Sequence, residues 1–278
     1  MSPRFFAAGA ALLLAQPIES QPVPAPRSQL TYADLADLSL AAPVVVHLRV
    51  RDADALDPRD APNVPPGHRR FLVEADVVAL IRGAGGLPER VSYLVDVAND
   101  SRGRPARLRD RDEMLVLASR APGRPAELRL AAPDAQLPYT AEAAARLRAI
   151  LRDSTAADAP PRLTGIGRAF HVAGSLPGES ETQIFLQTAN QRPISLNILR
   201  RPGQQPRWSV ALSEIVDEAA APPAPETLLW YRLACTLPPR LPAQSLSEAT
   251  PDEARAIQAD YRVVIEGLGP CARTRARR

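Results

Sequence analysis

The chain has 278 residues, 45% of them hydrophobic, and a formal net charge of +3. This is enough apolar material for a buried core, so the composition excludes a globally disordered chain. All 34 basic residues are arginines, and four of them, Arg273, Arg275, Arg277 and Arg278, stand in a short C-terminal tail. Without this tail the body is mildly acidic, which is not the charge pattern of a nucleic-acid-binding protein. We expect residues 272–278 to form a frayed, solvated terminus, with contact to an anionic membrane surface or RNA as the alternative.

The first twenty residues have the pattern of an export signal. Arg4 precedes an apolar run over residues 5–14, which is about half the length that a membrane-spanning helix needs. Either Ala15 or Ser20 is the last residue removed, and a Pro-rich extended linker follows over 21–29. We therefore predict a periplasmic protein that has no transmembrane segment once the signal is removed.

Residues 30–153 are predicted to form a first, β-rich domain. Thr31 caps a short helix at its start, and Thr140 caps a second helix at its end. Alternating apolar residues between them predict strands near 43–50, 71–81, 91–97, 114–117 and 128–130. Five strands and a closing helix indicate a small antiparallel β-barrel-like module, with a curled antiparallel sheet as the alternative. Its strand order is compatible with an oligonucleotide/oligosaccharide-binding-like (OB-like) barrel.

Residues 162–271 are predicted to form a second domain, after a small-residue break over 154–161. Four short strands near 166–172, 182–188, 194–198 and 208–212 are joined by short loops, which is typical of an antiparallel meander. A helix is predicted over 226–237, with a strand as the alternative because Leu228, Trp230 and Tyr231 have high strand propensity. A capping box from Thr250 to Glu253 begins a final helix. The predicted fold class is α+β: the barrel-like module with its helix, then the meander packed with two helices.

The chain has two cysteines, Cys235 and Cys271. In an exported protein an isolated pair is usually a disulfide. A free or metal-binding pair is the alternative, but there is no CxxC spacing and the chain has only three histidines. We predict a disulfide that staples the final helix to the segment 226–237.

Two stretches of the second half resemble a known group of proteins. They are Gly-Ser-Leu-Pro-Gly-Glu-Ser-Glu-Thr-Gln-Ile-Phe-Leu over 174–186, and Thr-Leu-Leu-Trp-Tyr-Arg-Leu-Ala-Cys over 227–235. On these residues the chain resembles uncharacterised exported proteins of high-GC alphaproteobacteria. The resemblance implies an exported protein and carries no activity.

The sequence shows no GxSxG elbow, P-loop, dinucleotide fingerprint or HExxH motif. We therefore expect no cofactor, and His47, His68 and His171 lack the short spacing of metal ligands. His171 has Ser175, Ser180, Glu179 and Glu181 close in sequence, which is the basis for a hydrolase hypothesis centred on the 174–181 turn. The simpler interpretation is a hairpin whose polar turn is solvated.

Six residues are the candidates for ligand binding. A histidine and two acidic residues lie around the 174–181 turn, and two arginines lie near a tryptophan. These residues are His171, Glu179, Glu181, Arg200, Arg201 and Trp208. Paired carboxylates suit acid–base work on a glycan, whereas arginines with a tryptophan suit an acidic group or a sugar ring. The expected function is a periplasmic, non-enzymatic binding or accessory protein whose partner is an unknown envelope protein or glycan. An envelope-directed hydrolase is the alternative.

Overall fold

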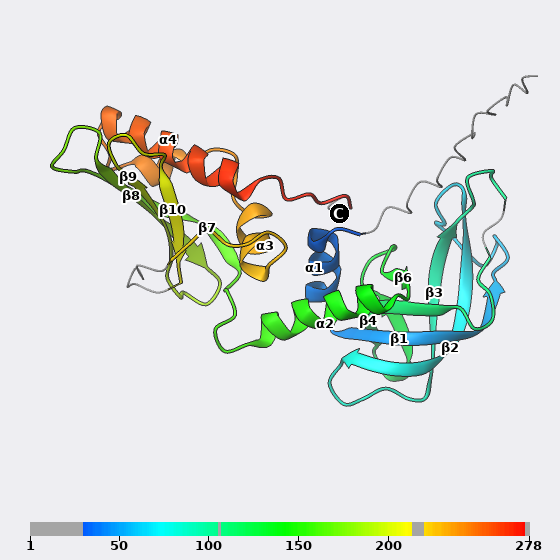
Figure 1. Cartoon of the computed structure of the whole chain (residues 1–278). Helices are drawn as coiled ribbons and strands as arrows, with labels where there is room; N and C mark the ends of the chain where they lie inside the picture. The colour runs from blue at the N-terminus through cyan, green and yellow to red at the C-terminus, as the bar shows by residue number, and fades with distance from the viewer. Residues whose placement is uncertain (1–29, 105–106, 213–219, 276–278) are drawn as a thin grey trace, which may run out of the picture.

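The computed structural model describes residues 30–104, 107–212 and 220–275. Figure 1 shows a β-barrel at one end, a sheet crossed by a long helix at the other, and shorter helices between them. The predicted signal over 1–20 and linker over 21–29 lie outside the described residues. No helix in the described part of the chain is both long and apolar enough to cross a membrane.

The N-terminal sheet is a closed barrel. Its strands are β1 (Val44–Ala55), β2 (His68–Arg82), β3 (Arg90–Ala98), β4 (Glu113–Ala121), β5 (Arg124–Leu130) and the short β6 (Gln136–Pro138). The order is β1-β2-β3-β5-β4-β6, and β1 also pairs with β4, which closes five strands into a ring. All pairs are antiparallel except β3 with β5, which confirms the predicted OB-like barrel. The prediction from sequence missed β6.

One strand makes the closure. β1 pairs with β2 along its length and with β4 over Val44–Arg49, and its pairing with β2 shifts register at three points. Such bulges bend and twist a strand, so β1 can serve two neighbours on opposite sides. The apolar face of the alternation points inward, and Val46, Leu48, Val73 and Val116 are fully buried. The barrel interior is therefore a packed core.

Two helices flank the barrel. α1 (Tyr32–Ala41) begins with a capping box in which Thr31 and Asp34 satisfy each other's backbone N–H groups. α2 (Ala141–Thr155) begins at Thr140, whose hydroxyl accepts a hydrogen bond of 3.0 Å from the Ala143 N–H. Both caps were predicted from the sequence. The buried side of α2 packs toward α1 in the region between barrel and sheet (Figure 1).

The C-terminal sheet is the predicted meander. β7 (Leu163–Ala173), β8 (Ser180–Thr188), β9 (Ile194–Arg200) and β10 (Arg207–Ala211) pair antiparallel in the order β10-β9-β8-β7. α4 (Pro251–Leu268) lies along one face of this sheet (Figure 1). The segment 226–237 contains α3 (Leu228–Ala234), so the helix prediction is confirmed and the strand alternative is wrong. A short 3-10 helix, η1 (Ala243–Leu246), was not predicted.

Buried side chains connect the two halves. The predicted break over 154–161 coincides with the connection from α2 to β7. One continuous apolar cluster nevertheless includes Leu117 of β4, Leu147 of α2, Leu163 of β7, Leu233 of α3 and Tyr261 of α4. Because burial of shared apolar area opposes separation, the region around α1, α2 and α3 joins the barrel to the sheet.

Candidate functional site

The side-chain alternation of the meander sends the six candidate residues in different directions. His171 lies opposite Thr182, Thr182 opposite Ile198, and Ile198 opposite Trp208. Residues opposite one another share a face, and Ile198 is in the core, so His171 and Trp208 face α4. Glu181 follows the opposite parity and is exposed on the other face. The six residues therefore do not form one site.

Two of the six, His171 and Arg200, meet at a residue that the sequence analysis missed. Asp260 of α4 is completely buried. Arg200 donates from Nε to Asp260 Oδ1 at 2.5 Å, and the Thr182 hydroxyl donates to Asp260 Oδ2. His171 Nδ1 lies 2.8 Å from Thr182 Oγ1 and therefore donates to it, since the hydroxyl hydrogen is already directed to Asp260. The signal in the sequence was a carboxylate within the apolar stripe of Ile257, Tyr261 and Val264.

This network is closed to substrate at its centre. Thr182 and Asp260 are both fully buried, and the Asp260 carboxylate is satisfied by Thr182 and Arg200. Within the described residues, neither Ser175 nor Ser180 forms a hydrogen bond with His171. A buried carboxylate with a guanidinium and a hydroxyl around it is a structural arrangement that ties α4 to β8 and β9.

The other candidate residues have separate surroundings. Glu179 turns back into its own hairpin, where its carboxylate accepts a hydrogen bond of 3.4 Å from the Leu176 N–H. Arg201 is exposed just beyond the end of β9. Trp208 packs over Gly267 of α4, so closely that a Cβ at 267 would lie 2.5 Å from the indole Nε1.

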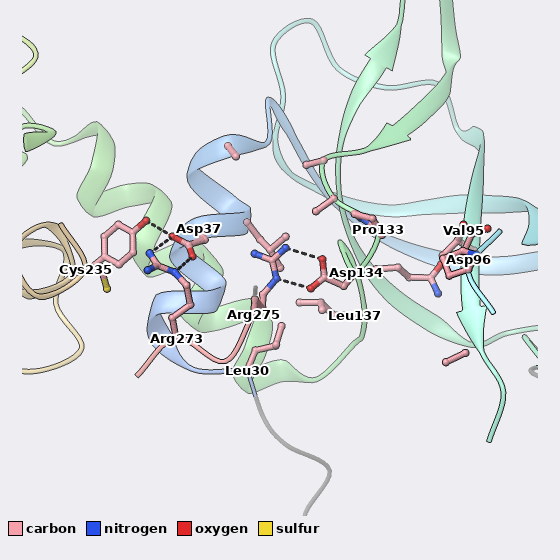
Figure 2. Close-up of a pocket in the computed structure, with 18 of the residues that line it drawn as sticks. Leu30, Asp37, Val95, Asp96, Pro133, Asp134, Leu137, Cys235, Arg273 and Arg275 are labelled. Atoms are coloured by element: carbon pink, nitrogen blue, oxygen red, sulfur yellow. Dashed lines mark hydrogen bonds and ion pairs between the residues drawn. The ribbon is translucent and has the colours of Figure 1, made fainter. Parts of the chain in front are cut away.

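A cleft lies elsewhere, between the barrel and α3 (Figure 2). This cleft has a volume of about 970 Å³. Its walls come from α1, the end of β3, the loop between β5 and β6, the start of β7, α3 and the C-terminal residues. The cleft thus forms where segments distant in sequence meet.

The carboxylates of the cleft are each neutralised by an arginine. Asp96 pairs with Arg70 through two hydrogen bonds of 2.7 and 2.8 Å. Asp134 accepts a similar bidentate pair of hydrogen bonds from the Arg275 guanidinium, at 2.6 and 2.7 Å. Asp37 accepts from the Arg273 guanidinium and, at 2.6 Å, from the Tyr231 hydroxyl. Figure 2 shows the last two of these carboxylates with their arginines at the α1 side of the cleft.

Two further arginines line the cleft without such a partner. In the described part of the chain, no ion pair involves Arg162 or Arg232, and the Arg232 Nε is buried without a hydrogen bond. Burial lowers the pKa of Arg232, and the neighbouring charge of Arg162 lowers it further. The α3 end of the cleft therefore has an excess of positive charge.

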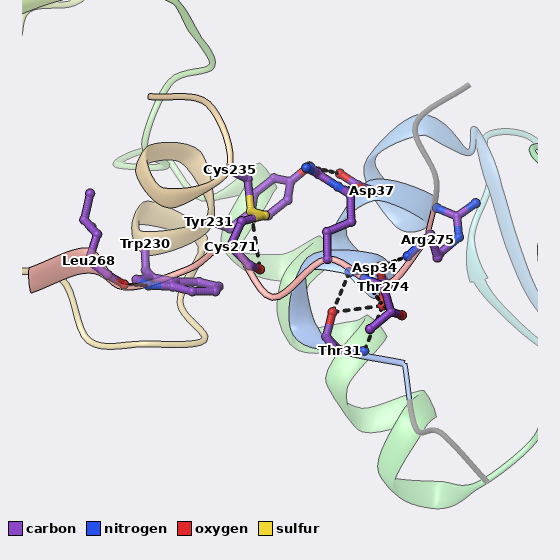
Figure 3. Close-up of a disulfide and its surroundings, with 11 residues drawn as sticks. Thr31, Asp34, Asp37, Trp230, Tyr231, Cys235, Leu268, Cys271, Thr274 and Arg275 are labelled. Atoms are coloured by element: carbon purple, nitrogen blue, oxygen red, sulfur yellow. Dashed lines mark hydrogen bonds and ion pairs between the residues drawn. A yellow bond between two sulfur atoms is a disulfide. The ribbon is translucent and has the colours of Figure 1, made fainter. Parts of the chain in front are cut away.

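A C-terminal strap, residues 271–275, forms one wall of the cleft. The predicted disulfide between Cys235 and Cys271 is present, with an S–S distance of 2.11 Å, and it anchors the strap to the end of α3 (Figure 3). The free-cysteine alternative is wrong. Beyond the disulfide, Arg273 lies against α1 and Arg275 reaches the loop that follows β5.

The strap corrects the prediction of a frayed, solvated tail over residues 272–278. Asp34 of α1 is completely buried and accepts hydrogen bonds from the Thr274 N–H and hydroxyl and the Arg275 N–H. Burial opposes the charge of Asp34, but these hydrogen bonds and those from Thr31 outweigh it and lower the pKa of its carboxyl. The tail is ordered through 275 because buried carboxylates need donors; residues 276–278 lie outside the described residues.

Nothing in the described residues groups three or more potential metal ligands. The cleft was not predicted from the sequence. No short motif could have revealed it, since its two unpaired arginines stand seventy residues apart in the chain and become neighbours only in the fold. No protein-family model matches this chain, and no curated protein matches it.

Proposed function

We propose that the chain is a periplasmic, non-enzymatic binding or accessory protein that holds part of its partner in the cleft between the barrel and α3. The supporting observation is the composition of that cleft. It has apolar walls from Leu30, Leu38 and Leu163 together with charged groups around them. Concave surfaces of this size, mostly apolar with a few placed polar groups, are the usual form of ligand sites.

The surroundings of His171 favour binding over hydrolysis. A serine hydrolase needs a base whose free nitrogen faces an accessible nucleophile. The hydroxyl that His171 contacts belongs to Thr182, which is fully buried and already donates to Asp260. A substrate cannot reach that oxygen without the hairpin opening.

The disulfide supports the proposed compartment. Cys235 and Cys271 form a pair in a chain with no other cysteine, and such bonds persist in oxidising compartments. An envelope protein or a glycan is the partner class that this compartment offers.

The test is affinity capture from envelope extract with three full-length baits. Ala41 is exposed at the end of α1 and lines the cleft, so Ala41→Trp fills the cleft from its surface without entering the core. Ala145→Trp is the matched control, since Ala145 is exposed on α2 and is not part of the cleft. We expect the wild type and Ala145→Trp to retain the same component and Ala41→Trp to lose it. Equal retention by all three baits would show that the partner does not use the cleft.

A further inference from the structure

We propose that the α3 end of the cleft is an oxyanion site, in which Arg162 and Arg232 bind a carboxylate or phosphate group carried by a ligand with an apolar portion. This inference rests on the proposed binding function and names the ligand chemistry of the same cleft. It is carried by the charge balance of the cleft, by one guanidinium nitrogen left without a partner in the described part of the chain, and by the apolar lining beside it.

The charge balance points to an anion. The three cleft carboxylates, Asp37, Asp96 and Asp134, are occupied by Arg273, Arg70 and Arg275. Arg162 and Arg232 remain, both line the cleft, and Arg162 lies close enough to disfavour the charge of Arg232. Two like charges at one end of a partly enclosed cavity attract a group of opposite charge.

The hydrogen-bond balance points the same way. The Arg232 Nε is buried and has no hydrogen-bond partner in the described part of the chain. Buried donors without acceptors are rare in folded proteins and mark positions where a further group belongs.

Guanidinium chemistry selects oxyanions. An arginine presents planar, diverging N–H groups that match the two oxygens of a carboxylate or two oxygens of a phosphate. Arg162 is exposed at the rim, whereas Arg232 is largely covered, so an incoming anion meets the first and is desolvated against the second. The bound group would pair with the two guanidinium charges that the described part of the chain leaves without a carboxylate.

The apolar lining defines the rest of the ligand. Leu30, Leu38, Ala41 and Leu163 line the same cleft as the two arginines. A fully polar anion such as free phosphate would leave these apolar side chains exposed to water. An anion with a short hydrocarbon body uses both parts, because its methylene groups are removed from water against the apolar lining.

The experiment is isothermal titration of the full-length oxidised protein with three probes that share one hydrocarbon chain: octanoate, octyl phosphate and 1-octanol. The variants are Arg162→Gln and Arg232→Gln, and Arg148→Gln is the matched control because Arg148 is exposed on α2, outside the cleft. We expect octanoate, octyl phosphate or both to bind the wild type and the control about tenfold more tightly than either variant, as loss of a charge-assisted hydrogen bond implies. Octanol should bind all four proteins equally and more weakly than the preferred anion. The tighter anion identifies the group as a carboxylate or a phosphate.

Other outcomes refute the inference in distinguishable ways. Unchanged anion binding in both arginine variants would overturn it, and so would the absence of anion binding to the wild type. In one outcome, octanol binds, the two anions bind no more tightly than octanol, and Ala41→Trp abolishes the binding of octanol. The cleft is then a ligand site, and only the oxyanion inference fails. If no probe binds and the Ala41→Trp bait retains the same partner as the wild type, the proposed function fails as well. Since Arg162 is exposed, its variant tests the inference even if Arg232→Gln folds poorly.

Discussion

Removal of the Cys235–Cys271 disulfide should cost about 4 kcal/mol of stability. The bond closes a segment with a sequence separation of 36. In the chain-entropy account, a loop of that length restricts the unfolded chain by about 4 kcal/mol at 25 °C. The relevant variant is the double substitution Cys235→Ser and Cys271→Ser, which leaves no free thiol, and the measurement is the free energy of unfolding in urea, compared with the oxidised wild type.

The structure also predicts where the effect spreads. The strap follows Cys271 directly and donates to Asp34 and Asp37 of α1, so a released strap leaves buried carboxylates of the first half with fewer donors. Hydrogen exchange at the amides of α1 should therefore become faster in the double variant, whereas the barrel strand β2, which the strap does not touch, should keep its protection. A stability loss below about 1 kcal/mol, compared with the loop-length expectation, or unchanged exchange in α1, would refute this reasoning.

Three other substitutions test the structure independently. Arg232→Met should raise the free energy of unfolding by about 1 kcal/mol, because it removes a buried donor that lacks a partner in the described part of the chain. Arg148→Met, on the exposed side of α2, should leave the free energy of unfolding nearly unchanged. A loss of stability in urea for Arg232→Met would contradict the absence of a hydrogen-bond partner. Asp34→Asn should destabilise the protein at pH 7 by about 2 kcal/mol. The pKa of Asp34 is lower in the folded state, so the stabilisation by its carboxylate is present above the unfolded-state pKa near 4 and is lost as the pH falls through the folded-state pKa. The melting temperatures of the variant and the wild type should therefore converge below about pH 4. A constant difference between the two melting temperatures down to about pH 2 would be the contrary result. Gly267→Ala should lower the stability by about 1 to 3 kcal/mol because its Cβ would meet the Trp208 indole, and a melting temperature equal to that of the wild type would show that the contact yields freely.

Much of the fold was predictable because its signals are local. The alternation from Val44 to Val50 specifies a strand whatever lies beside it, and the capping boxes at Thr31 and Thr250 specify where helices begin. The barrel-like module followed from counting such strands and their turns, whereas its closure was shown by the pairing of β1 with β4. β6 was missed because it has only three residues, too few to show a period.

The candidate site was predicted far less well, for a geometric reason. His171 and Glu181 are near neighbours in one hairpin, but their strand positions have opposite parity, so one faces α4 and the other faces away. His171 and Arg200 were singled out from the sequence as ligand-binding candidates. Their partner, Asp260, lies sixty residues after Arg200 on another element, and only the packing of α4 on the sheet brings them together.

The sequence by itself determined the fold class, most helices and strands and the cysteine pair, because periodicity, caps and turns depend on residues within a few positions of one another. Only the tertiary structure decided that the basic tail is a strap, that Asp37, Asp96 and Asp134 are neutralised in place, and that two arginines are left over in a cleft. Charge balance inside a cavity depends on which side chains are excluded from water together. That grouping is set by the packing of α1, α3 and the strap between the two sheets, and no stretch of the chain encodes it alone.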